Sequence, residues 1–122
     1  MGTSQRNIGG RNEERRRNPR FPFVANAEVS ETSAGTRIKV RVTEISIYGC
    51  YLDMLNPFAV GTEVFVKIFT AADIFETSAI VVYSHPNLGV GLAFRDVSPH
   101  SLSTLQKWLA EAAAEDGHAD QN

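Results

Sequence analysis

Hydrophobic and polar residues alternate along most of the chain, and this alternation predicts β-strands. From Phe21 to Val29 every second residue is apolar, which is the period of a strand with one buried face. Turn-forming residues follow at 32–35, and apolar residues then alternate with charged ones around Ile38 to Val42. These two segments are predicted to pair as a hairpin.

Four further segments have the pattern of short strands, with turn-forming residues between them. They run from Gly49 to Met54, Val64 to Thr70, Phe75 to Ser84 and Gly89 to Arg95. Six short strands at close spacing are typical of an all-β fold. We therefore predict a six-stranded antiparallel β-barrel.

The hydrophobic period changes from two to that of a helix after Ser98. Five apolar residues fall on one helical face: Leu102, Leu105, Trp108, Leu109 and Ala112. Ser98 suits the N-cap and Pro99 the first helical position. The pattern predicts one C-terminal α-helix packed against the barrel, followed by a disordered tail over residues 116–122.

Composition places the chain among single-domain globular proteins. It has 122 residues, of which 43% are hydrophobic and 21% charged. The longest apolar runs, such as 79–83, are far shorter than the roughly 18 residues that a membrane span needs. The lone Cys50 and the lack of a secretory pattern lead us to expect a cytoplasmic protein without membrane insertion.

Charge is distributed unevenly. Residues 1–20 hold six arginines against two glutamates, a net charge of +4, whereas residues 21–122 carry −6. Residues 1–14 lack an apolar period, and we expect them to form a flexible basic arm. Charge alone leaves two interpretations open, a solvated tail or an arm for a small anionic partner. Nucleic acid is disfavoured as the partner because the acidic body would repel a polyanion.

The sequence lacks the residue spacings of an enzyme or a metal site. His85, His100 and His118 do not have metal-ligand spacing, and there is no glycine-rich phosphate loop. Cys50 lies in an apolar strand, where a cysteine is usually a small buried hydrophobe. We therefore expect no catalytic residue, no metal and no cofactor.

Two polar segments suit an anionic ligand that carries guanine. Residues 15–20 read Arg-Arg-Arg-Asn-Pro-Arg, and residues 44–49 read Glu-Ile-Ser-Ile-Tyr-Gly. The planar fork of arginine matches two acceptors at once, on a phosphate or on the guanine O6/N7 edge. A carboxylate can accept hydrogen bonds from guanine N–H groups, and a serine hydroxyl can bond a base or sugar.

These segments resemble the PilZ domain, the bacterial receptor module for cyclic di-GMP. The family pattern is RxxxR followed by [D/N]xSxxG, and here Arg16 to Arg20 and Glu44 to Gly49 stand about 25 residues apart. The likeness covers residues 15–112, so we expect a PilZ-like domain over 15–115. The sequence departs from the pattern at Glu44, whose extra methylene moves the carboxylate by roughly 1.5 Å relative to Asp.

The resemblance implies a role for each matching residue. Arg16 and Arg20 would grip guanine and phosphate, Glu44 and Ser46 would contact a guanine, and Gly49 would shape the turn. The residue before RxxxR, here Arg15, influences whether the family binds one ligand or a stacked pair.

The resemblance also implies a mode of action. Binding of cyclic di-GMP would fold the arm over the ligand and change the surface shown to a downstream protein partner. The alternative is a degenerate PilZ domain that recognises another protein without a nucleotide.

Overall fold

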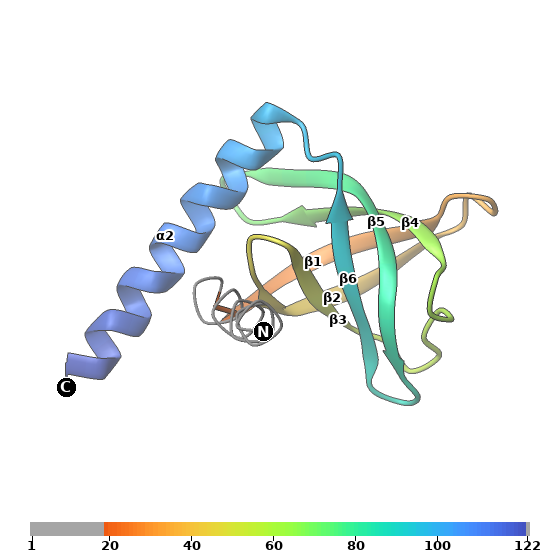
Figure 1. Cartoon of the computed structure of the whole chain (residues 1–122), viewed down its shortest axis with the longest axis horizontal. Coiled ribbons are helices and arrows are strands. Elements are labelled where there is room, and N and C mark those ends of the chain that lie inside the picture. The colour runs from red at the N-terminus through yellow and green to blue at the C-terminus, as the bar shows by residue number, and fades with distance from the viewer. Residues whose placement is uncertain (1–18, 122) are drawn as a thin grey trace, which may run out of the picture.

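The computed structural model describes residues 19–121, with side chains to residue 115, as six strands followed by one helix (Figure 1). The elements are β1 (Phe21–Glu31), β2 (Arg37–Ile45), β3 (Gly49–Asp53), β4 (Glu63–Phe69), β5 (Ile74–His85), β6 (Gly89–Arg95) and α2 (Pro99–Gln121). Every segment predicted as a strand is a strand, with bounds that differ by a few residues.

The strands close into an antiparallel barrel in the order β1-β2-β3-β6-β5-β4. β1 pairs with β2 on one side and with β4 on the other, so the sheet has no first or last strand. This confirms the predicted six-stranded barrel with a C-terminal helix. Because β6 lies between β3 and β5, the start of β3 comes close to the later part of β5.

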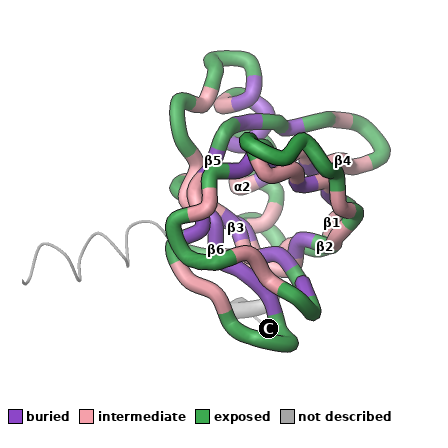
Figure 2. The backbone as a smooth tube through the Cα atoms, turned by 90° about the vertical axis from the view of Figure 1, so that its right-hand side faces the viewer, coloured by how far each residue is buried: buried purple, intermediate pink, exposed green. Residues whose placement is uncertain are grey.

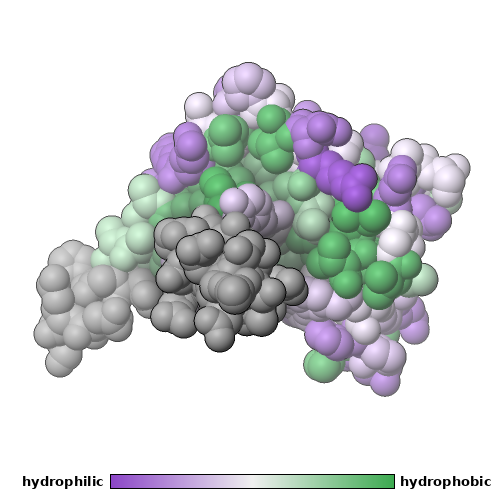
Figure 3. All heavy atoms as spheres, in the orientation of Figure 1, coloured by the Kyte–Doolittle hydropathy of each residue, from purple (hydrophilic) through white to green (hydrophobic). Residues whose placement is uncertain are grey.

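Aliphatic side chains on alternate positions fill the barrel. In β4, Val64, Val66 and Ile68 are buried, whereas Phe65 between them is 40% exposed. The same alternation of buried and exposed positions follows most of β5 (Figure 2), whereas the first four residues of β6 are all buried. On the face shown in Figure 3, hydrophobic side chains gather in patches on the outside of the protein. Among the outward side chains of β5, Val82 is 46% exposed.

Three β-bulges interrupt the alternation. They lie between Pro22 and Ala25 in the β1–β2 pairing, between Val42 and Glu44 in the β2–β3 pairing, and between Val81 and Tyr83 in the β5–β6 pairing. A bulge adds one residue to one strand and so reverses the face that the following side chains occupy. Glu44 and Tyr83 each follow such a reversal.

Helix α2 packs its apolar stripe against one end of the barrel. Ser98 caps it as expected, since its Oγ accepts a hydrogen bond from the Ser101 N–H at 3.2 Å. Trp108 is 2% exposed and lies 5.2 Å from Phe23 and 6.2 Å from Phe75, measured between ring centroids. These contacts confirm that the stripe faces the barrel.

Helix α2 continues to Gln121, over most of residues 116–122, for which a disordered tail is the expectation from the sequence. The alanine- and glutamate-rich residues 110–115 favour helix, and adding a residue to an existing helix costs little. The expected arm over residues 1–14 lies outside the described residues, as does the start of the domain at Arg15. No helix within the described part of the chain is long and apolar enough to cross a membrane.

Candidate functional site

Arg20, directly before β1, reaches across the outside of the barrel to two other strands. Its Nη1 donates a hydrogen bond to the Tyr83 hydroxyl at 3.1 Å and lies 3.6 Å from Glu44 Oε1. The guanidinium carbon is also 5.9 Å from the centre of the Tyr83 ring. Both polar contacts use the same nitrogen, and the side chain stays 58% exposed, so the remaining N–H donors of the fork can still take an anion.

A tight turn between β2 and β3 forms the next part of the site. The Ser46 Oγ accepts hydrogen bonds from the backbone N–H groups of Tyr48 and Gly49, each at 3.2 Å. The Ser46 N–H donates to the Gly49 carbonyl at 2.8 Å. The hydroxyl of Ser46 therefore holds the turn together, and the residue is only 9% exposed.

Gly49 is required by how closely two strands approach each other. A Cβ at this position would run into the backbone carbonyl oxygen of Leu92 on β6. Any larger residue would push β3 away from β6 and open the turn that Ser46 closes.

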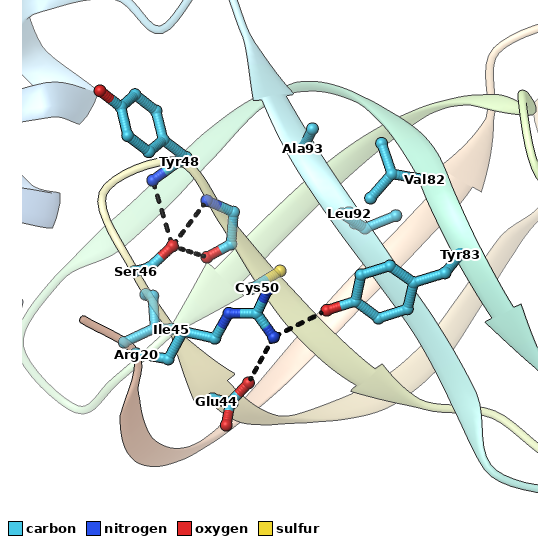
Figure 4. A pocket seen from close by; sticks show the side chains of 11 residues that line it. Arg20, Glu44, Ile45, Ser46, Tyr48, Cys50, Val82, Tyr83, Leu92 and Ala93 are labelled. Atoms are coloured by element: carbon cyan, nitrogen blue, oxygen red, sulfur yellow. Dashed lines mark hydrogen bonds and ion pairs between the residues drawn. The ribbon is translucent and has the colours of Figure 1, made fainter. Parts of the chain in front are cut away.

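Arg20, Glu44 and the turn surround one pocket of about 150 Å³ on the outer wall of the barrel (Figure 4). The residues that line it are Arg20, Glu44, Ile45, Ser46, Tyr48, Gly49, Cys50, Val82, Tyr83, Leu92 and Ala93. They come from the residue before β1, the end of β2, the turn that follows it, the start of β3, and from β5 and β6. Side chains far apart in sequence thus meet around Arg20.

The bulges explain why Glu44 and Tyr83 face this pocket. Val42 and Val81 point into the core, and strict alternation would send the residues two positions later inward as well. The extra residue in each bulge turns Glu44 and Tyr83 outward instead. Bulges of this kind commonly re-aim side chains at functional sites.

Cys50 lies beneath the pocket, and its thiol is unreactive near neutral pH. Burial raises the pKa of its thiol to about 12, so the reactive thiolate does not form near neutral pH. The expectation of a buried hydrophobe is confirmed. In residues 19–115 no group of three or more His, Cys, Asp or Glu side chains is placed to hold a metal ion.

The structure brings together four of the six predicted site residues, namely Arg20, Glu44, Ser46 and Gly49. Arg15 and Arg16 lie outside the described residues. Tyr83, whose hydroxyl and ring both contact Arg20, was not predicted from the sequence as a site residue.

The fold and site are thus a closed six-stranded barrel with a polar pocket around Arg20 on its outer wall. The family model of the PilZ domain matches residues 14–111, and the chain belongs to this family. PilZ domains are non-enzymatic receptor modules. No curated protein matches the chain by sequence.

Solved structures support the same fold. The PilZ domain of YcgR from Escherichia coli with c-di-GMP superposes with a TM-score of 0.66 at 14% identity, covering 88% of this chain and 98% of that one. The Bacillus subtilis inhibitor of motility, MotI/DgrA, gives 0.68 at 16% identity, covering 83% and 52%. The PilZ domain of CeSA from a cellulose-synthesizing bacterium gives 0.60 at 14% identity, covering 74% and 93%.

Proposed function

We propose that this chain is a receptor for cyclic di-GMP and that the Arg20 pocket is part of its binding site. The observation that carries the proposal is the position of Arg20, whose half-exposed guanidinium stands beside Glu44 and the Ser46–Gly49 turn. A guanidinium fork and an acceptor carboxylate next to each other match the donor and acceptor edges of guanine.

Family membership supports the ligand class. The similar PilZ domain of YcgR is a structure with c-di-GMP, and this chain keeps the RxxxR spacing at Arg16 and Arg20. In the proposal, Arg16 and Arg20 bind phosphate and guanine, while Arg15 influences whether one ligand or a stacked pair binds. Glu44 contacts guanine, and Ser46 and Gly49 hold the turn against which the ligand lies.

Isothermal titration with cyclic di-GMP tests the proposal. We expect saturable heat for the wild type and an affinity about 5- to 150-fold lower for Arg20→Ala, since a bidentate arginine contact contributes about 1–3 kcal/mol. Arg37→Ala is the matched control, because Arg37 on β2 is also exposed and pairs with Glu28 at 3.9 Å, outside the pocket. An Arg20→Ala variant that binds as tightly as the wild type would contradict the site.

We further propose that ligand binding changes the conformation of the basic arm, residues 1–14, and thereby signals to a protein partner. The arm contains Arg6 and Arg11, and trypsin cleaves on the carboxyl side of arginine. Cyclic di-GMP should slow tryptic cleavage there in the wild type and leave it unchanged in Arg20→Ala. A cleavage rate that ligand does not alter would argue against this signalling step.

A further inference from the structure

A second hollow adjoins the Arg20 pocket on the outside of the barrel. It has a volume of about 380 Å³ and is lined by Arg20, Thr43, Glu44, Tyr51, Tyr83 and His85. Arg20, Glu44 and Tyr83 belong to both hollows, so they form a ridge between them. The Arg20 guanidinium can therefore contact a ligand group in either hollow.

Three aromatic rings, those of Tyr51, Tyr83 and His85, line this second hollow. Tyr51 and Tyr83 are stacked, with ring centroids 6.2 Å apart and planes at 28°. His85 lies 5.4 Å from the Tyr83 ring, and its Nδ1 is hydrogen-bonded to the Tyr51 hydroxyl at 3.1 Å. Three rings from β3 and β5 thus make one continuous surface.

Glycines on the intervening strand let these rings lie close to the barrel wall. A Cβ at Gly91 would collide with the ring of Tyr83, and one at Gly89 would crowd the ring of Tyr51. β6 pairs with both β3 and β5, so the two tyrosines reach over it from opposite sides. The lack of side chains at Gly89 and Gly91 therefore leaves the room in which both rings lie against the outside of β6.

The chemistry of this hollow suits a planar heterocycle. Bases stack on aromatic side chains whatever their sequence, and a guanidinium adds a cation–π contact. Around the rings, the Thr43 hydroxyl, the Glu44 carboxylate and the His85 imidazole can hydrogen-bond the edge of a base. Burial, with smaller contributions from the neighbouring Tyr83 and Asp53, raises the pKa of Tyr51 above its ordinary value. The hydroxyl, already protonated at neutral pH in an ordinary tyrosine, is therefore a hydrogen-bond donor there.

We infer that the Tyr51–Tyr83–His85 hollow binds the second guanine of the same dinucleotide whose first guanine and phosphate are held at Arg20. This inference rests on the proposed function. Two hollows that share one arginine fit a ligand in which two bases are joined by phosphates. The hollow makes the receptor selective for a dinucleotide over a mononucleotide.

The aromatic NMR resonances of the tyrosines provide the direct test, because the chain contains only three of them, Tyr48, Tyr51 and Tyr83. During titration of the wild-type protein with cyclic di-GMP, we expect the ring protons of Tyr51 and Tyr83 to shift through the ring current of a stacked base. This measurement needs no variant and so does not depend on a mutant folding.

Affinity measurements on Tyr51→Leu complete the test. Leucine keeps the apolar cover over Gly89 and removes the ring, and we expect about tenfold weaker binding of cyclic di-GMP, the scale of one lost base–aromatic stack. Phe65→Leu is the control, since Phe65 is an exposed aromatic on β4 outside both hollows. Its affinity should equal that of the wild type.

The outcomes separate the two proposals. Wild-type protein that binds saturably, with an unshifted Tyr51 ring and unchanged affinity in Tyr51→Leu, would overturn the second subsite and leave the receptor function standing. Wild-type protein that shows no saturable binding would overturn the receptor function and the second subsite with it.

Discussion

Arg20 and Glu44 form an ion pair at 3.6 Å across the mouth of the pocket, with both side chains about half exposed. The pair joins the residue before β1 to the bulged end of β2. In the proposed receptor, the Glu44 carboxylate is paired with the Arg20 guanidinium, to which a phosphate or guanine of the ligand would also bind. The carboxylate and the ligand therefore compete for the same guanidinium.

Replacing Glu44 with a neutral residue should remove this competition. We expect Glu44→Asn to bind cyclic di-GMP about threefold more tightly, since an exposed ion pair contributes less than about 1 kcal/mol and asparagine keeps a carbonyl acceptor. Titration calorimetry gives the comparison. Glu28→Asn, which breaks the Glu28–Arg37 pair at 3.9 Å, is the control and should not change the affinity. Weaker binding by Glu44→Asn would show that the carboxylate itself is the better ligand contact.

The Ser46 hydroxyl should stabilise the fold independently of any ligand. Ser46→Ala leaves the N–H groups of Tyr48 and Gly49 without their side-chain acceptor, and we expect the free energy of unfolding to fall by about 1–3 kcal/mol. Urea denaturation followed by Trp108 fluorescence measures it. Ser78→Ala, at an exposed position on β5, should stay within about 0.5 kcal/mol of the wild type. Equal stabilities for the two variants would refute the role of the hydroxyl.

The buried side chain of Trp108 should contribute most of the free energy that holds α2 against the barrel. It is 2% exposed between Phe23 and Phe75, and Trp108→Ala is expected to lower the free energy of unfolding by about 3–5 kcal/mol. Circular dichroism during urea denaturation is the suitable measurement, because the chain has only this one tryptophan. Gln106→Ala, at an exposed position on the same helix, is the control. A loss below about 1 kcal/mol would mean that the helix is held elsewhere.

Cys50 should make stability fall at alkaline pH. Burial raises the pKa of its thiol from 9.0 to about 12, so the unfolded chain releases this proton at a pH where the folded chain still holds it. The contribution to stability is complete below pH 9 and is lost as the pH rises toward 12, by about 1.4 kcal/mol per pH unit at most.

The comparison that isolates this effect is the unfolding free energy of the wild type minus that of Cys50→Ala, measured from pH 8 to 11. Titration of other groups cancels in the difference. We expect a constant difference up to about pH 9 and a decline above it. A difference that stays flat over the whole range would show that the thiol does not titrate as its burial requires.

The barrel could be predicted from the sequence because its wall imposes one rule on every strand. Most strand residues alternate between a buried and an outward face, and Val64, Val66 and Ile68 of β4 follow this period of two. The period says nothing about which strands pair. The placement of β6 between β3 and β5 became known only from the structure.

The site was predicted only in part for the same reason. Glu44, Ser46 and Gly49 are near neighbours in sequence, so a motif can bring them together. Tyr83 is 63 residues from Arg20, and strict alternation after Val81 assigns it to the core. Only the bulge before Tyr83 turns it outward, and no residue in the strand signals that bulge by itself.

The closure of the barrel also limits how a protein partner can attach. Every strand already has a hydrogen-bonded neighbour on each side, because β1 pairs with both β2 and β4. β-Augmentation, the mode in which a new strand adds to an exposed edge, is therefore confined to stretches that extend past a neighbour, such as residues 21–25 of β1, which lie beyond the pairing with β4. Over the rest of the barrel, a protein partner would be recognised through side chains, which can change without disturbing the fold.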